Sequence, residues 1–212
     1  MNILFTSDLH GYIAAYTRFS EILSNKKYDV GIISGDLVSF SHNKLKSENH
    51  IKEILHQANK RIFFIMGNDD GVIGHDWSDT TLLLNPNLKK IKYEKINFVG
   101  YQYTNPVVGG PFEKTGEEQM KDLPQLIELI DSNTIFISHG PPYGILDQVY
   151  DKQHVGSVAL RKLVERKKPI FHLFGHIHES HGIHGNSING AYPILRKFVS
   201  IDLTHHMVNF VE

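Results

Sequence analysis

Short runs of β-branched and aromatic residues recur along this chain, and they constrain its fold more than any other feature does. They comprise residues 3–7, 30–34, 62–66, 96–101, 135–138 and 170–174. Short continuous apolar runs are typical of strands that are buried on both faces of a sheet. Helical patterns lie between several of these runs, so strands and helices alternate. Such alternation predicts an α/β domain.

The predicted helices share apolar residues that are spaced three or four positions apart. The first covers residues 13–23, and the fourth covers residues 155–167 and ends before Pro169. We predict a second helix around Ile51, Ile54, Leu55 and Ala58 and a third around Met120, Leu123, Leu126, Ile127 and Ile130. The apolar face of the fourth helix would consist of Val158, Ala159, Leu163 and Val164. We predict a loop over residues 102–119 and strands without an intervening helix over residues 192–211. No repeat or linker interrupts the pattern, and the length suits one domain over residues 1–212.

Composition narrows the class of protein. Apolar residues make up 41% of the 212 residues and charged residues 21%, as in ordinary globular proteins. The net charge of −1 carries no basic excess, so we expect no specific nucleic-acid binding. No apolar stretch is long enough to span a membrane, and the opening residues lack the pattern of a signal peptide, so we expect a cytoplasmic protein without a membrane anchor. Cysteine is absent, which leaves His, Asp, Glu and Asn as the side chains available for a transition-metal site.

Five of the apolar runs are followed by Asp, Asn or His. Ligands of open α/β sheets bind outside the carboxyl ends of the strands, so these five clusters could converge on one point. Convergence would bring together Asp8, His10, Asp36, Asn68, His139, His176 and His178. Seven nitrogen and oxygen ligands are too many for one tetrahedral ion and suit two cations that share a ligand.

Each cluster alone also has an ordinary explanation. Gly-Asp after a strand is often a helix cap or turn, and Gly-Asn is a common turn signal. A single histidine such as His139 can be a core residue with a satisfied ring. Five such clusters, each at a strand end, are hard to explain as five separate turns. Residues 173–185 also contain His181 and His184, which we interpret as loop residues near the site. We interpret His172, just before this stretch, as a core residue or as a partner of a ligand.

The ordered series of motifs resembles that of the calcineurin-like metallophosphoesterases. It consists of Asp8-x-His10, Gly35-Asp36, Gly67-Asn68-x-Asp70, His139-Gly140 and Gly175-His176-x-His178, and it spans residues 8–178. The resemblance implies the metallo-dependent phosphatase fold, a four-layer α/β/β/α sandwich of two mixed β-sheets flanked by helices. It further implies that Asp8, His10 and His178 bind one metal ion, and that Asn68, His139 and His176 bind the other. Asp36 would bridge the two ions.

Other segments place the chain within that family and mark one departure. The stretch HGPPYGILDQV from His139 resembles the small single-domain phosphodiesterase branch. The second motif continues as GDLVSF, without the Asp-Arg-Gly of serine/threonine phosphatases, and the long capping domain of the DNA-repair nucleases is missing. The third motif usually carries a histidine that is implied to protonate the leaving group, whereas this chain has Asp69. The catalytic candidates are therefore Asp36, His10 and Asp69, with the general acid left open.

These residues predict a binuclear-metal phosphoesterase. It would hydrolyse a phosphodiester, or a monoester, of a small nucleotide-like substrate by attack of a hydroxide that bridges the ions. Mixed His and carboxylate ligands favour Mn, Fe, Zn, Co or Ni over Ca or Mg, and manganese is our first candidate. The alternative is a phosphoesterase-like scaffold with weak or no turnover that binds a partner protein. Because all seven ligands are present, we favour the enzyme; a nuclease is disfavoured by charge, and the oligomeric state stays open.

Overall fold

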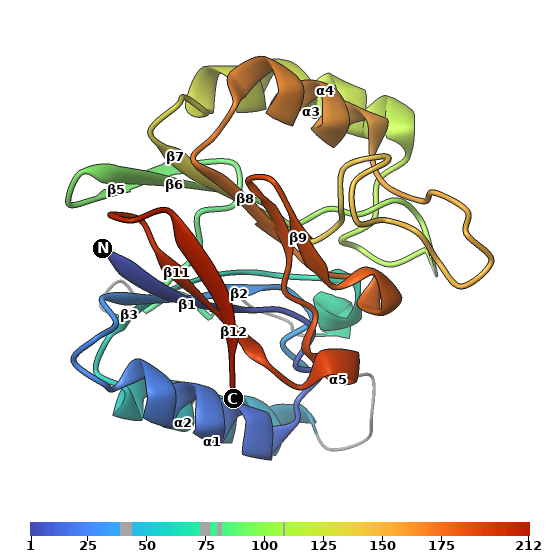
Figure 1. Cartoon of the computed structure of the whole chain (residues 1–212). Helices are drawn as coiled ribbons and strands as arrows, with labels where there is room; N and C mark the ends of the chain where they lie inside the picture. Colours follow the sequence, from blue (N-terminus) through green and yellow to red (C-terminus); the bar gives the residue numbers. More distant parts are fainter. Residues whose placement is uncertain (39–43, 73–76, 80–81, 108) are drawn as a thin grey trace.

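The structure, a computed structural model, describes residues 1–38, 44–72, 77–79, 82–107 and 109–212. It contains two six-stranded sheets that lie face to face (Figure 1). The first has the strand order β12-β11-β1-β2-β3-β4, and the second has the order β5-β6-β7-β8-β10-β9. Both sheets are mixed: the first is antiparallel only at its β12-β11-β1 side, and the second is antiparallel at both edge pairs, with parallel pairs elsewhere.

The first sheet contains β1 (Asn2–Thr6), β2 (Val30–Ser34), β3 (Arg61–Ile65), β4 (Leu83–Leu84), β11 (Phe198–Asp202) and β12 (Met207–Val211). The second contains β5 (Lys90–Tyr93), β6 (Ile96–Tyr101), β7 (Thr134–Ser138), β8 (Phe171–Phe174), β9 (Gly182–His184) and β10 (Ser187–Asn189). The helices are α1 (Ile13–Leu23), α2 (Lys44–Gln57), α3 (Gly116–Leu129), α4 (Val158–Lys167) and α5 (Tyr192–Leu195), with 3-10 turns η1 (Asn68–Val72) and η2 (His178–Ser180). None of the described helices is both long and apolar enough to cross a membrane.

Helices cover the outer face of each sheet. In Figure 1, α1 and α2 lie along the first sheet, and α3 and α4 lie along the second. On β1, Ile3 and Phe5 point toward the second sheet, whereas Leu4 belongs to the core under α1. Between the sheets, the rings of Phe63 and Phe98 stack with centroids 3.8 Å apart. Burial on both faces explains why the strands read as continuous apolar runs, and the predicted four-layer sandwich is confirmed.

Several boundaries differ from the sequence prediction. Helix α3 begins at Gly116, within the predicted loop, because Thr115 and Glu118 form a reciprocal capping box. Helix α4 begins at Val158, three residues later than predicted, because the Ser157 side chain caps it. Val158 is 53% exposed, so it does not belong to the predicted apolar face of α4, and the buried Leu160 takes that place.

The C-terminal prediction was wrong in one respect. Residues 192–195 form α5 before the strands begin at Phe198. Pro193 lies in the first turn of α5, where a missing backbone N–H costs no helical hydrogen bond. The sequence interpretation also missed strands β9 and β10, so His184 lies in a strand and not in a loop.

Candidate metal centre

The loops that carry the seven candidate ligands meet where the carboxyl ends of both sheets come together. Backbone bonds join the loop after β1 to the loop after β2, from Asp8 N–H to the Gly35 carbonyl at 3.1 Å and from His10 N–H to the Asp36 carbonyl at 2.8 Å. A further bond joins the loops after β8 and β7, from Gly175 N–H to the His139 carbonyl at 3.0 Å. The structure thereby brings the candidates from five strand ends together, as the sequence argument requires.

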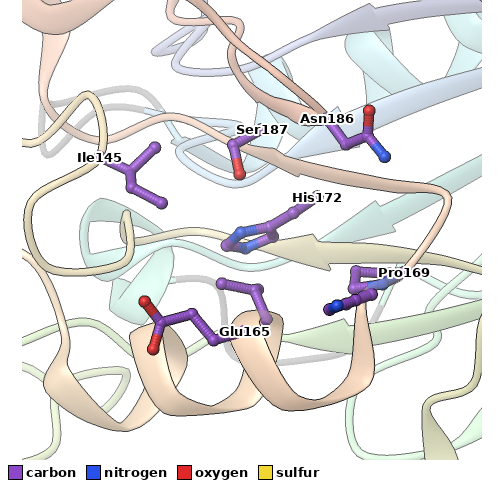
Figure 2. Close-up of a pocket in the computed structure, with 8 residues that line it drawn as sticks. Ile145, Glu165, Pro169, His172, Asn186 and Ser187 are labelled. Atoms are coloured by element: carbon purple, nitrogen blue, oxygen red, sulfur yellow. The ribbon is translucent and has the colours of Figure 1, made fainter.

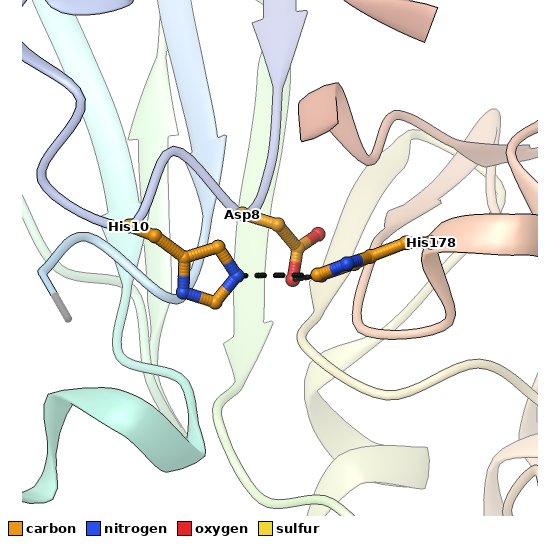
Figure 3. Close-up of side chains that lie close together, drawn as sticks. All are labelled: Asp8, His10 and His178. Carbon is orange, nitrogen blue, oxygen red and sulfur yellow. Dashed lines mark hydrogen bonds and ion pairs between the residues drawn. The ribbon is translucent and has the colours of Figure 1, made fainter. Parts of the chain in front are cut away.

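The first group consists of Asp8, His10 and His178 (Figure 3). The Nε2 atoms of His10 and His178 are 3.3 Å apart, and His178 Nε2 lies 3.5 Å from Asp8 Oδ1. Asp8 is buried and also accepts the backbone N–H of His176 with both carboxylate oxygens, at 3.1 and 3.0 Å. Three ligand atoms from both sheets therefore face one small volume.

The second group consists of Asp36, His139 and His176, with Asn68 beside them. His139 Nε2 lies 3.3 Å from Asp36 Oδ1 and 3.0 Å from Asn68 Oδ1. The rings of His139 and His176 meet edge to face with centroids 5.0 Å apart. This group again combines ligands from the two sheets.

Asp36 belongs to the second group and also faces the first. Its Oδ1 faces His139 Nε2 at 3.3 Å, and its Oδ2 faces His10 Nε2 at 3.8 Å. One carboxylate thus directs a different oxygen at each group, which is the arrangement that a bridging ligand needs.

Hydrogen bonds fix which nitrogen of each ring faces the centre. His139 Nδ1 donates to the Ser34 carbonyl at 2.8 Å, so Nε2 is the atom that faces Asp36 and Asn68. His10 Nδ1 lies 3.1 Å from Asp69 Oδ2, which leaves Nε2 facing His178. Partners of this kind orient histidine ligands in metal sites and increase their basicity.

The donor atoms fit divalent cations. Two nitrogens on one tetrahedral ion, with bonds of about 2.0–2.1 Å, lie roughly 3.3 Å apart. The distances of 3.0 to 3.5 Å among these donors are of that size. The set contains imidazole nitrogens, carboxylates and one amide oxygen, a mixture that suits first-row transition metals.

The buried carboxylates and imidazoles of the centre shift one another's pKa values. Burial disfavours charge on His139, but Asp36 and Asp8 outweigh this effect and raise the pKa of His139 to about 10. Burial likewise opposes charge on His10, and Asp69 and Asp36 raise the pKa of His10 to about 8. Burial and the charge of His139 lower the pKa of His176 to about 4. Protons therefore occupy nitrogens that a bound cation would require to be free.

The backbone at the centre is strained. Asp8, His10, Asp36 and His176 have positive φ angles between 45° and 70°, in the left-handed region that residues other than glycine rarely adopt. Such residues concentrate at functional sites, where the surrounding structure holds them. Gly175 permits the close approach of two loops, because a Cβ at this position would collide with Asp8 Oδ2 and Ser7 Oγ.

Asp70 has a structural role that the sequence interpretation did not assign. It is fully buried and accepts the backbone N–H groups of Leu37 at 3.0 Å, Val38 at 2.9 Å and Gly67 at 2.8 Å. Burial and the nearby charge of Asp36 raise the pKa of Asp70 to about 7. Asp70 thereby joins the loop that carries Asp36 to the loop that carries Asn68.

Replacing Asp70 with alanine should lower the free energy of unfolding by about 3 kcal/mol or more. The change leaves three backbone N–H groups without their acceptor, and each unsatisfied buried group costs about 1–3 kcal/mol. Urea unfolding in the presence of a chelator measures the effect without a contribution from metal binding. Asp69→Ala is the matched control, because the Asp69 side chain is 26% exposed and accepts no backbone N–H group among the described residues. A loss below about 1 kcal/mol for Asp70→Ala, the lower end for one unsatisfied group, would contradict this role.

His172 lies in the core and not among the ligands. Its Nε2 lies 2.7 Å from Ser138 Oγ, which donates its proton to the Gly140 carbonyl, so the ring donates from Nε2. Burial lowers the pKa of His172 to about 3. The ring also lines a cavity of about 330 Å³ between α4 and β8, together with Ile145 and Ser187 (Figure 2).

The other predicted neighbours of the site differ in position. His181 is half-buried, and its Nδ1 lies 3.1 Å from the His178 carbonyl, so it is next to a candidate ligand as expected. His184 is exposed on the edge strand β9.

Comparisons with known proteins show the family of this chain and structures of similar fold. A model of the calcineurin-like phosphoesterase family matches residues 1–180. UPF0046 protein K07C11.7 of Caenorhabditis elegans is 29% identical over 160 residues, which cover 76% of this chain and 49% of that protein, so the chain spans about half the length of this relative. The crystal structure of TT1561 of Thermus thermophilus is similar in fold, with a TM-score of 0.72 and 17% identity over 100% of this chain and 98% of that one. A dimetal phosphatase from Danio rerio has a TM-score of 0.62 and 10% identity over 94% of this chain and 91% of that one.

The family match covers most of the chain and contains all the motifs on which the predicted resemblance rests. The chain therefore belongs to the calcineurin-like phosphoesterase family, as the resemblance of its motifs predicts.

Proposed function

We propose that this protein is a binuclear-metal phosphoesterase that hydrolyses a phosphodiester, or a monoester, of a small nucleotide-like substrate. The observation that carries the proposal is the position of Asp36, with one oxygen directed at each of two histidine-containing groups. Asp8, His10 and His178 would hold one ion, and Asn68, His139 and His176 the other, with manganese as the first candidate. The fold shared with a dimetal phosphatase supports a two-ion centre.

The residues of the chain divide the chemical work among them. Two divalent ions, when bound by these residues, would lower the pKa of a water nucleophile and offset the negative charge of the phosphoester. Asp36 holds the two ligand groups in register, and Asp69 orients His10 through its Nδ1. Asp70 fixes the backbone of the loops that carry Asp36 and Asn68. Rigid positioning of this kind lowers the barrier by holding substrate and nucleophile in line.

We also propose that residues 1–212 form a single domain, because both sheets contribute to the core between them. The complete lack of cysteine suits a protein of the reducing cytoplasm.

Metal analysis and turnover test the proposal together. Protein purified without chelator should contain divalent metal, and it should hydrolyse bis(p-nitrophenyl) phosphate or p-nitrophenyl phosphate in the presence of manganese. Protein that binds no metal and turns over neither ester would instead support the scaffold function.

The hydrogen bonds of Asp69 lead to a separate prediction about which leaving groups the enzyme can expel. Its Oδ2 pairs with His10 Nδ1 at 3.1 Å and its Oδ1 accepts from Asn68 Nδ2 at 3.1 Å, so both carboxylate oxygens act as acceptors. A general acid must instead carry a proton that it can give to the leaving group. We expect good turnover of nitrophenyl esters and poor turnover of alkyl esters. Asp69→Asn should change nitrophenyl ester hydrolysis by less than about tenfold, or roughly 1.4 kcal/mol of barrier, because the asparagine oxygen can still accept from His10 Nδ1 and keep that ring oriented.

The measurement is a plot of log kcat/KM against leaving-group pKa for wild type, Asp69→Asn and Asp69→His. Asp69→His restores the residue usual in the family, and it should help alkyl esters more than nitrophenyl esters. A shallow wild-type slope that steepens in Asp69→Asn would show that Asp69 donates the proton and that this expectation is wrong.

A further inference from the structure

A cleft of about 230 Å³ opens directly beside the first ligand group. Asp8 and His10 line it together with Tyr12, Tyr192 and Arg196. The walls come from opposite ends of the sequence, because Tyr12 precedes α1 and Tyr192 begins α5. A substrate held at Asp8 and His10 would therefore have this cleft next to it.

The tyrosine walls are aromatic and accessible. Tyr12 is 50% exposed, and as the residue before α1 its side chain makes no capping hydrogen bond. The ring of Tyr192 is held in place by stacking on Phe198, with centroids 5.1 Å apart and an interplanar angle of 24°. Pro193 adds a rigid apolar surface beside Tyr192. Fixed aromatic side chains bind planar rings without a large loss of conformational entropy.

Arg196 supplies a cation to the same cleft. It ends α5 in a left-handed conformation, with φ of 52°, and its backbone N–H bonds to the Tyr192 carbonyl at 2.7 Å. Its side chain is exposed and forms no ion pair within the part of the chain that the structure describes. A guanidinium without a carboxylate partner can stack on an aromatic ring and donate to acceptor atoms on the edge of that ring.

We propose that this cleft binds a planar aromatic group of the phosphoester substrate, such as a nucleobase or an aryl group, between Tyr12, Tyr192 and Arg196. The inference rests on the proposed function, and it adds the part of the substrate that the ligand groups do not recognise. A second phosphate is the less favoured occupant, because one cation among aromatic and apolar walls provides few donors for it. The cleft is also smaller than the roughly 300–1,000 Å³ usual for sites that enclose a whole ligand, so it suits one ring system rather than an entire nucleotide.

Binding of two phosphonates tests the proposal without turnover. Benzylphosphonate and methylphosphonate share the anionic head, differ by the aromatic ring, and contain a carbon–phosphorus bond that the proposed reaction does not cleave. Isothermal titration calorimetry with manganese-loaded protein should show a Kd for benzylphosphonate that is at least about fivefold lower, since stacking is worth about 1–3 kcal/mol and 1.4 kcal/mol corresponds to tenfold.

Variants of the cleft residues test whether the preference for benzylphosphonate arises in this cleft. Arg196→Gln and Tyr12→Ala should each reduce the ratio of the two Kd values by about fivefold or more, because the aromatic ring loses a contact that methylphosphonate does not make. Arg166→Gln and Tyr150→Ala are matched controls at exposed positions that do not line the cleft, and they should keep the wild-type ratio. Equal affinity for both phosphonates, or an unchanged ratio in both cleft variants, would overturn the proposal.

Turnover of bis(p-nitrophenyl) phosphate, measured on the same preparations, distinguishes failure of the cleft proposal from failure of the proposed function. Turnover without an aromatic preference removes the cleft proposal and leaves the proposed function intact. An aromatic preference without turnover contradicts the proposed function and retains the cleft as a binding site.

Discussion

Asp36→Asn should lower kcat/KM for bis(p-nitrophenyl) phosphate by more than about 100-fold. Asp36 directs Oδ1 at His139 and Oδ2 at His10, so the change replaces one of these two oxygens with an NH2 group and removes the negative charge that both ligand groups share. Loss of a group that only orients a metal ligand commonly costs about 10–100-fold, and a shared ligand should exceed that range. No other single ligand replacement should cost as much.

The measurement is kcat/KM over a titration of manganese, for the wild type and for each ligand variant. Asp151→Asn is the matched control, because Asp151 is exposed and accepts only the backbone N–H of Gln153 among the described residues. If Asp36→Asn keeps the wild-type kcat at saturating manganese, Asp36 is not the bridge.

Removal of divalent ions should abolish turnover and lower the midpoint of thermal unfolding by at least about 5 °C. A ligand at about 100 times its Kd stabilises the native state by about 2.7 kcal/mol. For a domain of this size, about 1 kcal/mol corresponds to roughly 2–4 °C in Tm. Thermal unfolding with a chelator, and then with excess manganese, measures the shift, and manganese should restore turnover.

The same shift should depend on pH in a defined direction. In the ion-free centre the pKa of His139 is about 10 and that of His10 about 8, so protons compete with the cation at neutral pH. Lower pH strengthens this competition, and the stabilisation by manganese should therefore shrink as the pH falls from about 8 to about 6. His139→Gln should lose a large part of the shift, whereas His184→Gln, at an exposed strand position, should keep it. A Tm that is the same with and without manganese would contradict a metal centre.

The strands were predictable because a strand that is buried on both faces needs consecutive apolar residues. Leu4 faces the helices while Ile3 and Phe5 face the second sheet, so all three must be apolar. The convergence of the candidate ligands was predictable for a related reason, because polar residues at the ends of parallel strands meet at one edge. Both inferences depend on many residues obeying the same rule.

Features that depend on a few residues or on distant contacts were not predictable. Helix α5 covers only four residues, too few for a helical period, and strands β9 and β10 have three residues each. Asp70 contacts backbone groups 32 and 33 residues away, and a backbone donor leaves no trace in the residue type. Arg196 reaches the cleft beside Asp8 only because α5 lies near the end of β1, a placement that requires the complete fold.

Crystals grown with manganese should give two anomalous diffraction peaks at this site. One peak should be bounded by Asp8, His10 and His178, and the other by Asn68, His139 and His176, with Asp36 in contact with both. A single ion held away from Asp36, or two ions held by other residues, would contradict this arrangement.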